Sequence, residues 1–124
     1  LQGIENVTGT AGDDELRGNA GRNRLDGRDG DDVLQATAGS DILTGGDGAD
    51  RFVFDSGIGT ATVRDFSNGA DHLDLTAFDF ADFAAVAASA SESAGNLQIA
   101  LGDGDQITVR SLGLAEFSRD DVLI

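Results

Sequence analysis

The stretch from Gly9 to Val53 reads GTAGDDELR GNAGRNRLD GRDGDDVLQ ATAGSDILT GGDGADRFV, one nine-residue unit written five times without a gap. Every unit has glycine in the fourth place, an oxygen-bearing side chain in the sixth and a bulky apolar side chain in the eighth. These columns are Gly12, Gly21, Gly30, Gly39, Gly48; Asp14, Asn23, Asp32, Asp41, Asp50; and Leu16, Leu25, Leu34, Leu43, Phe52. Three columns in phase indicate a repeat architecture rather than a glycine-rich linker.

Each unit predicts a turn followed by a very short strand. Glycine allows the backbone to turn sharply, and x-Leu-x suits a strand with one side chain facing a core. One such strand cannot bury its apolar side chain alone, so the units must stack. If two units make one coil, Leu16, Leu34 and Phe52 fall on one sheet, while Leu25 and Leu43 fall on the other.

Stacking also aligns carboxylates. Asp14, Asp32 and Asp50 would form a like-charge column with a step of about 4.8 Å, the spacing of neighbouring strands. Such a column repels itself without a counter-ion. Calcium is a hard cation that takes carboxylate and backbone carbonyl oxygens, so the pattern predicts metal between coils.

The units resemble the RTX family, whose repeat is G-G-x-G-x-D-x-U-x. The resemblance implies a calcium-binding parallel β-roll in which each ion lies between one turn and the turn two units later. About three calcium ions are implied, held by the pairs Asp14/Asp32, Asn23/Asp41 and Asp32/Asp50. The carbonyls of the first four places complete the implied ligand set: Gly9, Ala11, Gly12, Gly27, Arg28, Asp29, Gly30, Gly39, Gly45, Gly46, Asp47 and Gly48.

Departures from the motif predict sites of unequal quality. Asn23 is neutral and follows Arg22, and Ala36 and Thr37 replace the opening glycines of the fourth unit. We expect the Asn23/Asp41 site to be the weakest. The last unit keeps its glycines and should be among the best formed.

Length and charge set limits on function. With 124 residues and 40% hydrophobic residues, the chain predicts one continuous domain. The net charge of -15, from 23 acidic residues against 8 arginines, disfavours nucleic acid and anionic membranes. There is no cysteine to form disulfides, and no apolar run is long enough for a membrane span. Because the chain begins at Leu1, we expect an upstream domain.

Other interpretations of the acidic and glycine-rich stretches fit less well. A phosphate-binding loop needs a helix start and usually a lysine. An EF-hand at Asp103 and Asp105 would place Ile107, Thr108 and Leu114 where a ligand, the turn glycine and the closing glutamate belong. A disordered linker predicts no apolar column.

Residues 1–8 are expected to form a degenerate leading unit of the roll at 1–53, because Val7 lies nine places before Leu16. Residues 54–124 are expected to form a β-sandwich-like C-terminal cap with one short helix, which makes the protein all-β. The helix is expected after Thr76 and Asp79, ending before Gly95. Its packing face would be Phe80, Phe83, Ala84 and Ala87.

The rest of this half predicts surface and turn features. A hairpin is expected between 96–101 and 106–110. His72, the only histidine, is interpreted as an exposed strand residue. Asp65, Asp71 and Asp74 are weighed as peripheral ligands, with surface charge or turn capping favoured.

The chain ends with Asp121, Val122, Leu123 and Ile124. Their pattern resembles the end of proteins exported by bacterial type I secretion, such as serralysin-like metalloproteases, although a closing strand fits it too. The resemblance implies a secreted, calcium-dependent folding module, non-catalytic itself, at the C-terminus of a larger exported protein. Its partners would be calcium, the upstream domain and the type I secretion apparatus.

A polysaccharide-binding module, as in alginate epimerases, is the alternative function. Arginines within the repeats would hold uronate carboxylates: Arg17, Arg22, Arg24, Arg28 and Arg51. Charge balance among neighbouring acids is the competing role for these arginines. An enzyme is disfavoured, because no His-Glu-x-x-His pattern is present.

Overall fold

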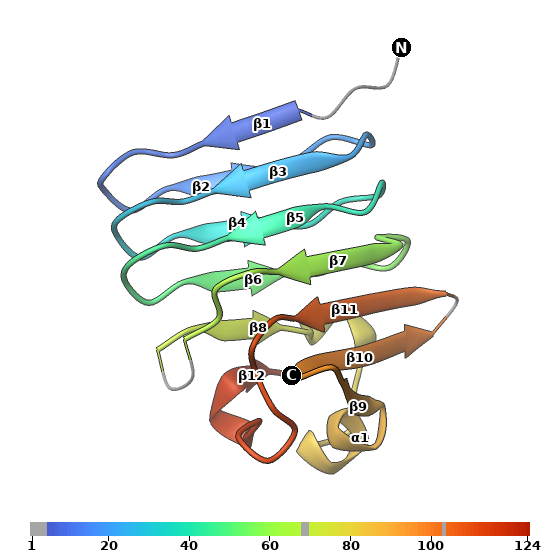
Figure 1. The fold of residues 1–124 in the computed structure, drawn as a ribbon. Helices are drawn as coiled ribbons and strands as arrows, with labels where there is room; N and C mark the ends of the chain where they lie inside the picture. Colours follow the sequence, from blue (N-terminus) through green and yellow to red (C-terminus); the bar gives the residue numbers. More distant parts are fainter. Residues whose placement is uncertain (1–4, 68–69, 103) are drawn as a thin grey trace.

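The repeat region winds into a stack of short parallel strands. The structure, a computed structural model, describes residues 5–67, 70–102 and 104–124. Figure 1 shows successive strands alternating between two sheets that face each other. The first eight strands are β1 (Glu5–Thr8), β2 (Glu15–Arg17), β3 (Asn23–Asp26), β4 (Val33–Gln35), β5 (Ile42–Thr44), β6 (Arg51–Val53), β7 (Thr60–Val63) and β8 (His72–Asp74). Of these eight, the odd-numbered strands belong to a seven-stranded sheet and the even-numbered strands to a five-stranded sheet.

Two units make one coil, as predicted. Leu16, Leu34 and Phe52 align in parallel register on the five-stranded sheet. Leu25 and Leu43 align on the other sheet. Four of these five side chains are fully buried, and Leu16 is nearly so. The apolar column is therefore the core of the roll, which confirms the parallel β-roll.

The first unit is atypical. Val7 on β1 aligns with Leu25 and packs partly buried against the core. Residues 1–4 of the expected leading unit lie outside the described residues.

The roll continues beyond Val53, where the nine-residue period stops. The register offset is 18 residues between Leu16 and Leu34, and it grows to 20 between Ile42 and Thr62 and 21 between Phe52 and Leu73. The four-residue strand β7 and the longer segment between β7 and β8 absorb the extra residues, while the strands keep their places in the two sheets. Parallel stacking therefore outlasts the sequence repeat.

The C-terminal strands extend the same two sheets. In the seven-stranded sheet, β11 (Asp105–Val109) pairs in parallel with β7, then antiparallel with β10 (Asn96–Gly102), which pairs with β9 (Ala90–Ser93). In the five-stranded sheet, β12 (Val122–Leu123) pairs in parallel with β8. The predicted β10–β11 hairpin is confirmed, with Asp103 of its turn outside the described residues. A separate β-sandwich-like cap is not confirmed, because these strands continue the roll.

The short α-helix α1 spans Phe83–Ala88 and is shorter than predicted. Asp82, not Thr76 or Asp79, caps it, accepting a hydrogen bond from Ala85 N at 2.9 Å. Thr76 begins a separate 3-10 helix, η1 (Thr76–Phe78). The segment after α1 forms β9 instead, because pairing with β10 satisfies its backbone and outweighs helix propensity.

The packing face of α1 also differs from the prediction. Val86 is its buried residue, whereas Ala84 is exposed. Phe83 packs on Phe117 with ring centroids 5.2 Å apart. Phe117 precedes the 3-10 helix η2 (Arg119–Asp121). Figure 1 shows α1 and β9 at the end of the stack opposite β1, where they cover the last coil.

Candidate metal centre

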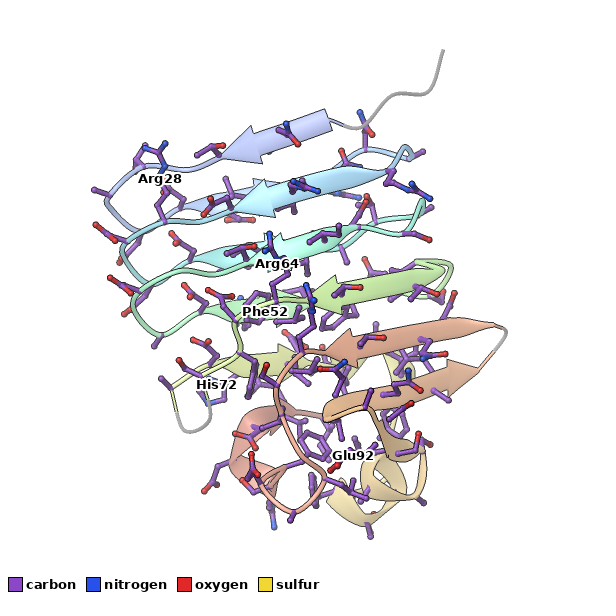
Figure 2. The ribbon with its side chains drawn as sticks, in the orientation of Figure 1. Arg28, Phe52, Arg64, His72 and Glu92 are labelled. Carbon is purple, nitrogen blue, oxygen red and sulfur yellow. The ribbon has the colours of Figure 1, made fainter. Side chains whose placement is uncertain are left out.

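The turns of the roll gather at two edges. Turns 9–14, 27–32 and 45–50 each follow an odd-numbered strand and stack on one edge, here called the Asp32 edge. It lies at the left of Figure 1, where Figure 2 labels Arg28. Turns 18–23 and 36–41 stack on the opposite edge, here called the Asn23 edge.

A ladder of carboxylates runs along the Asp32 edge. The Asp14 amide donates to Asp32 Oδ1 at 2.7 Å, and the Asp32 amide donates to Asp50 Oδ1 at 2.9 Å. Asp32 and Asp50 thus each have one oxygen bonded to the backbone of the preceding coil, whereas Asp14 Oδ2 accepts from Thr10 N of its own turn at 2.6 Å. The structure brings together the pairs Asp14/Asp32 and Asp32/Asp50 that the repeat predicts.

The second oxygen of two of these carboxylates has no hydrogen-bond donor among the described residues. Asp32 Oδ2 and Asp50 Oδ2 are buried, and neither has a hydrogen bond from the described residues. Both residues are only 1% exposed. A buried acceptor without a donor is costly, and far more so when it is charged. A cation is the missing partner that carboxylate chemistry calls for here.

Burial raises the pKa of both carboxyl groups. For Asp32 burial is the main cause, opposed by the hydrogen bond from the Asp14 amide and reinforced by the charge of Asp14. For Asp50 burial raises the pKa to about 7, with further contributions from the charges of Asp71 and Asp32. The ionised ladder is therefore unfavourable in the folded chain unless positive charge is supplied.

Turn carbonyls lie beside the Oδ2 atoms of the ladder carboxylates. If Gly27 were replaced by a residue with a side chain, its Cβ would overlap Asp32 Oδ2 and would lie 2.8 Å from the carbonyl oxygen of Gly45. A Cβ on Gly9 would lie 2.6 Å from Asp14 Oδ2 and 3.0 Å from the carbonyl oxygen of Gly27. A carboxylate oxygen and a carbonyl oxygen of the next coil thus face the same small space, and both are calcium ligands.

The ligand set cannot consist of side chains alone. In the described part of the chain, no group of three or more His, Asp or Glu side chains is placed to hold a metal ion. The Asp32 edge instead offers two carboxylates a coil apart with carbonyls between them. This donor set fits calcium, which accepts backbone carbonyls readily.

The ladder extends one coil beyond the sixth-place residues. Asp71 Oδ1 accepts from the Asp50 amide at 2.8 Å, and Asp71 Oδ2 accepts from Ser67 N at 2.8 Å. Asp65 accepts from the amides of Gly45 and Gly46 at 2.9 and 2.7 Å. A sequence signal for Asp71 exists, because GADHL at 69–73 repeats GADRF at 48–52 after a longer gap.

The Asn23 edge is organised differently. The backbone N–H of Asn23 donates to Asp41 Oδ1 at 2.9 Å, so the structure also brings Asn23 and Asp41 together. Asp41 Oδ2, however, accepts from Thr37 N at 2.8 Å. Asn23 Nδ2 donates to the carbonyl oxygens of Asn19, at 3.0 Å, and Gly21.

Comparison with known proteins agrees with this geometry. The family model described as the RTX calcium-binding nonapeptide repeat matches residues 1–34 and 26–61, with four copies. The chain carries RTX calcium-binding repeats. No curated protein sequence gives a significant match to the chain.

Two solved structures similar to this RTX chain are subunits of the mannuronan C5-epimerase of Azotobacter vinelandii. The AlgE6R3 subunit is 25% identical with a TM-score of 0.75, and the match covers 97% of this chain and 77% of that subunit. The AlgE6R2 subunit is 26% identical with a TM-score of 0.65, covering 97% and 92%.

The extracellular lipase LipA of Serratia marcescens shares the fold. It is 23% identical with a TM-score of 0.58, and the match covers 96% of this chain. This chain spans only 20% of the lipase. The likeness shows that this fold also occurs as a segment of a longer chain.

The repeat arginines do not gather on one surface of the RTX roll. Arg17 and Arg51 lie on the five-stranded sheet, whereas Arg24 lies on the seven-stranded sheet. Arg22 lies in a turn of the Asn23 edge and Arg28 in a turn of the Asp32 edge. All five are exposed.

Two other singled-out side chains lie on β8. His72 lies on the strand as predicted, but it is half-buried rather than exposed. Asp74 accepts from Thr76 N at 3.1 Å and lies 3.9 Å from Arg51 Nε, consistent with turn capping and surface charge.

The last residues are part of the folded RTX module. Asp121 is buried and accepts from Ser118 N at 2.8 Å, and Val122 is 7% exposed. Leu123 continues β12, and Ile124 is 45% exposed. The expected export residues thus also close the five-stranded sheet.

Within residues 5–67, 70–102 and 104–124, neither a pocket nor a membrane-spanning helix is found. No pocket is lined by the residues that the structure describes. None of the helices within that part of the chain is long and apolar enough to cross a membrane.

Proposed function

We propose that this chain is a calcium-dependent folding and secretion module of a larger exported protein, unfolded at low calcium and folded outside the cell. The observation that carries the proposal is the pair of buried, unpartnered oxygens Asp32 Oδ2 and Asp50 Oδ2. The proposed calcium ligands on the Asp32 edge are Asp14, Asp32 and Asp50, together with the turn carbonyls. Asn23 and Asp41 are the weaker pair that the sequence predicts.

The negative charge of the chain supports the proposal that its folded state has low stability without metal. The chain carries a net charge of -15, and its ladder carboxylates stack in one row. Bound calcium would neutralise this row of carboxylates and would be coordinated by the unpartnered oxygens Asp32 Oδ2 and Asp50 Oδ2. A ligand that binds only the folded state adds about 2.7 kcal/mol per site when present at about a hundred times its Kd.

The position of the C-terminal residues supports a link between folding and export. Asp121 and Val122 are buried in the folded chain, so an export apparatus would reach them only in the unfolded chain. Low calcium inside a cell would keep them accessible. Folding outside would then withdraw them and keep the protein from returning.

Circular dichroism of the 124-residue chain tests calcium-dependent folding. We expect β-sheet signal to appear when calcium is added to chelator-treated protein and to disappear when chelator is restored. Magnesium at the same concentration is the control and should act weakly, because it demands a small octahedral site and gives up water reluctantly. An identical spectrum in calcium and in chelator would contradict the proposal.

A polysaccharide-binding role is the second candidate, favoured by the likeness to the mannuronan C5-epimerase subunits. The outer face of the seven-stranded sheet carries Arg24, Arg64 and Arg110, all exposed, with Thr62 and Thr108 between them. Figure 2 shows Arg64 at the end of β7. Guanidinium groups on one face suit the carboxylates of a uronate polymer.

Calorimetric titration of mannuronate oligomers into the calcium-loaded chain tests this second role. We expect binding heat that falls sharply in the double variant Arg64→Ala/Arg110→Ala. The matched control is Arg17→Ala/Arg51→Ala, which removes the same charge from the opposite sheet and should bind normally. Absence of heat with the unmodified chain would leave only the folding role.

A further inference from the structure

The side chain of Asn23 fills the space that an ion would need on its edge. Asn23 is 1% exposed. Its Nδ2 donates to the carbonyl oxygens of Asn19, at 3.0 Å, and Gly21, and to Asp41 Oδ1 at 3.2 Å. A further contact joins Nδ2 to Asn19 Oδ1 at 3.2 Å. Carbonyl and carboxylate oxygens thus converge on a positively polarised NH2 group.

The orientation of this amide follows from its neighbours. Asn23 Oδ1 faces the backbone N–H of Asn19 at 3.4 Å. A reversed amide would place Nδ2 against that N–H and Oδ1 against the carbonyl oxygens of Asn19 and Gly21. Only the observed orientation gives attractive contacts on both sides of the amide.

Thr37 satisfies the remaining oxygens of the same turn pair. Its backbone N–H donates to Asp41 Oδ2 at 2.8 Å. Its hydroxyl lies 2.5 Å from the carbonyl oxygen of Asn19 and 3.1 Å from Asp41 Oδ2, and its single proton serves one of them at a time. Asp41 therefore has a backbone donor on each carboxylate oxygen, from Asn23 and from Thr37.

The two edges differ at Asp32 and Asp50, whereas Asp14 on the Asp32 edge resembles Asp41, because its Oδ2 accepts from Thr10 N at 2.6 Å. Asp32 and Asp50 on the Asp32 edge have buried side-chain oxygens without partners, and no such atom occurs among the described residues of the Asn23 edge. On the Asp32 edge, Arg28 N donates to Asp26 Oδ1 instead of to Asp32. The residues that replace motif positions in the second and fourth units, Asn23 and Thr37, are the ones that supply the extra donors.

We propose that the Asn23 edge closes without metal, with the Asn23 amide in the place of a cation, and that the calcium sites of the roll are confined to the Asp32 edge. This inference rests on the proposed calcium-binding role and narrows where it operates. The sequence predicts a weak ion at Asn23/Asp41, whereas the contacts assign this pair no ion. The turns 18–23 and 36–41 would then hold β3 and β5 in register whether or not calcium is present.

Counting bound calcium by native mass spectrometry, together with thermal unfolding, tests the assignment in two variants of the full chain. Asn23→Ala removes the side-chain NH2 donors but keeps the hydrogen bond from the backbone N–H of residue 23 to Asp41 Oδ1. We expect it to bind as many calcium ions as the unmodified chain and to unfold at a lower temperature. Asn23→Asp replaces the donors with a carboxylate, and we expect it to bind one calcium ion more.

The outcomes separate the inference from the proposed function. Loss of one calcium ion in Asn23→Ala would show that Asn23 is a ligand and would overturn the inference. An unchanged count in Asn23→Asp would overturn it as well, because the amide would not be what keeps the ion out. An unmodified chain that binds no calcium would instead refute the proposed function. If Asn23→Ala does not fold, Asn23→Asp in excess calcium still decides.

Discussion

Asp32→Asn is expected to abolish most of the calcium response of the chain. Asp32 is the middle residue of the ladder, joined through Oδ1 to Asp14 and through its amide to Asp50. It therefore faces both proposed sites of the Asp32 edge. Asparagine keeps the shape and an acceptor for the Asp14 amide but removes the charge that both sites need. When calcium is present at about a hundred times its Kd, each site adds about 2.7 kcal/mol to the free energy of unfolding, so the loss of two sites removes about 5 kcal/mol.

Calcium titrations followed by circular dichroism, with ion counting, measure this loss. Asn23→Ala is the matched control, since it alters the corresponding place on the opposite edge. Its calcium midpoint should lie near that of the unmodified chain. Equal titration midpoints for Asp32→Asn and Asn23→Ala would refute the pairing of Asp14, Asp32 and Asp50 as shared ligands.

Phe52→Ala is expected to destabilise the chain by about 3 to 5 kcal/mol without changing the number of calcium ions bound. Phe52 is fully buried, aligned between Leu34 and Leu73, and its ring centroid lies 6.4 Å from that of Phe66. Figure 2 shows it in the interior of the stack. Alanine would leave a cavity between neighbouring coils that a rigid parallel stack cannot close.

Urea unfolding in saturating calcium measures the effect. Phe52→Leu is the control, because leucine fills the same place in the other four units, and it should cost clearly less than alanine. Comparable losses for the two variants would mean that the site relaxes around either side chain. Reduced calcium binding in Phe52→Ala would contradict the separation of core and metal edge.

The repeat made most of the roll predictable. The eighth-place column set which side chains face the core, and the spacing of 18 residues set the register, as the alignment of Leu16, Leu34 and Phe52 shows. Glycine at the turn places was informative because the coils approach so closely there. At Gly48, for example, φ is 104° and an added Cβ would overlap the carbonyl oxygen of Gly30.

The C-terminal half was less predictable because its contacts are not periodic. Residues 90–93 follow an alanine-rich helix in sequence but form a strand, since the edge of β10 is there to pair with. Asp71 joins the ladder across a register offset of 21 residues, which a search for nine-residue units passes over.

By itself, the sequence determined the parallel roll, its two-unit coil and the oxygen-bearing column, because each depends on residue types recurring at a fixed interval. The tertiary structure decided which oxygens of that column are satisfied. Asp41 and Asp50 hold equivalent places in their units, yet Asp41 receives donors from Asn23 and Thr37, whereas Asp50 Oδ2 is buried with none from the described residues. That difference depends on where the second-place amide of each unit donates. Thr37 N donates to Asp41 within its own unit, whereas Gly46 N donates to Asp65 of a later turn, a relation across space that a single unit does not contain.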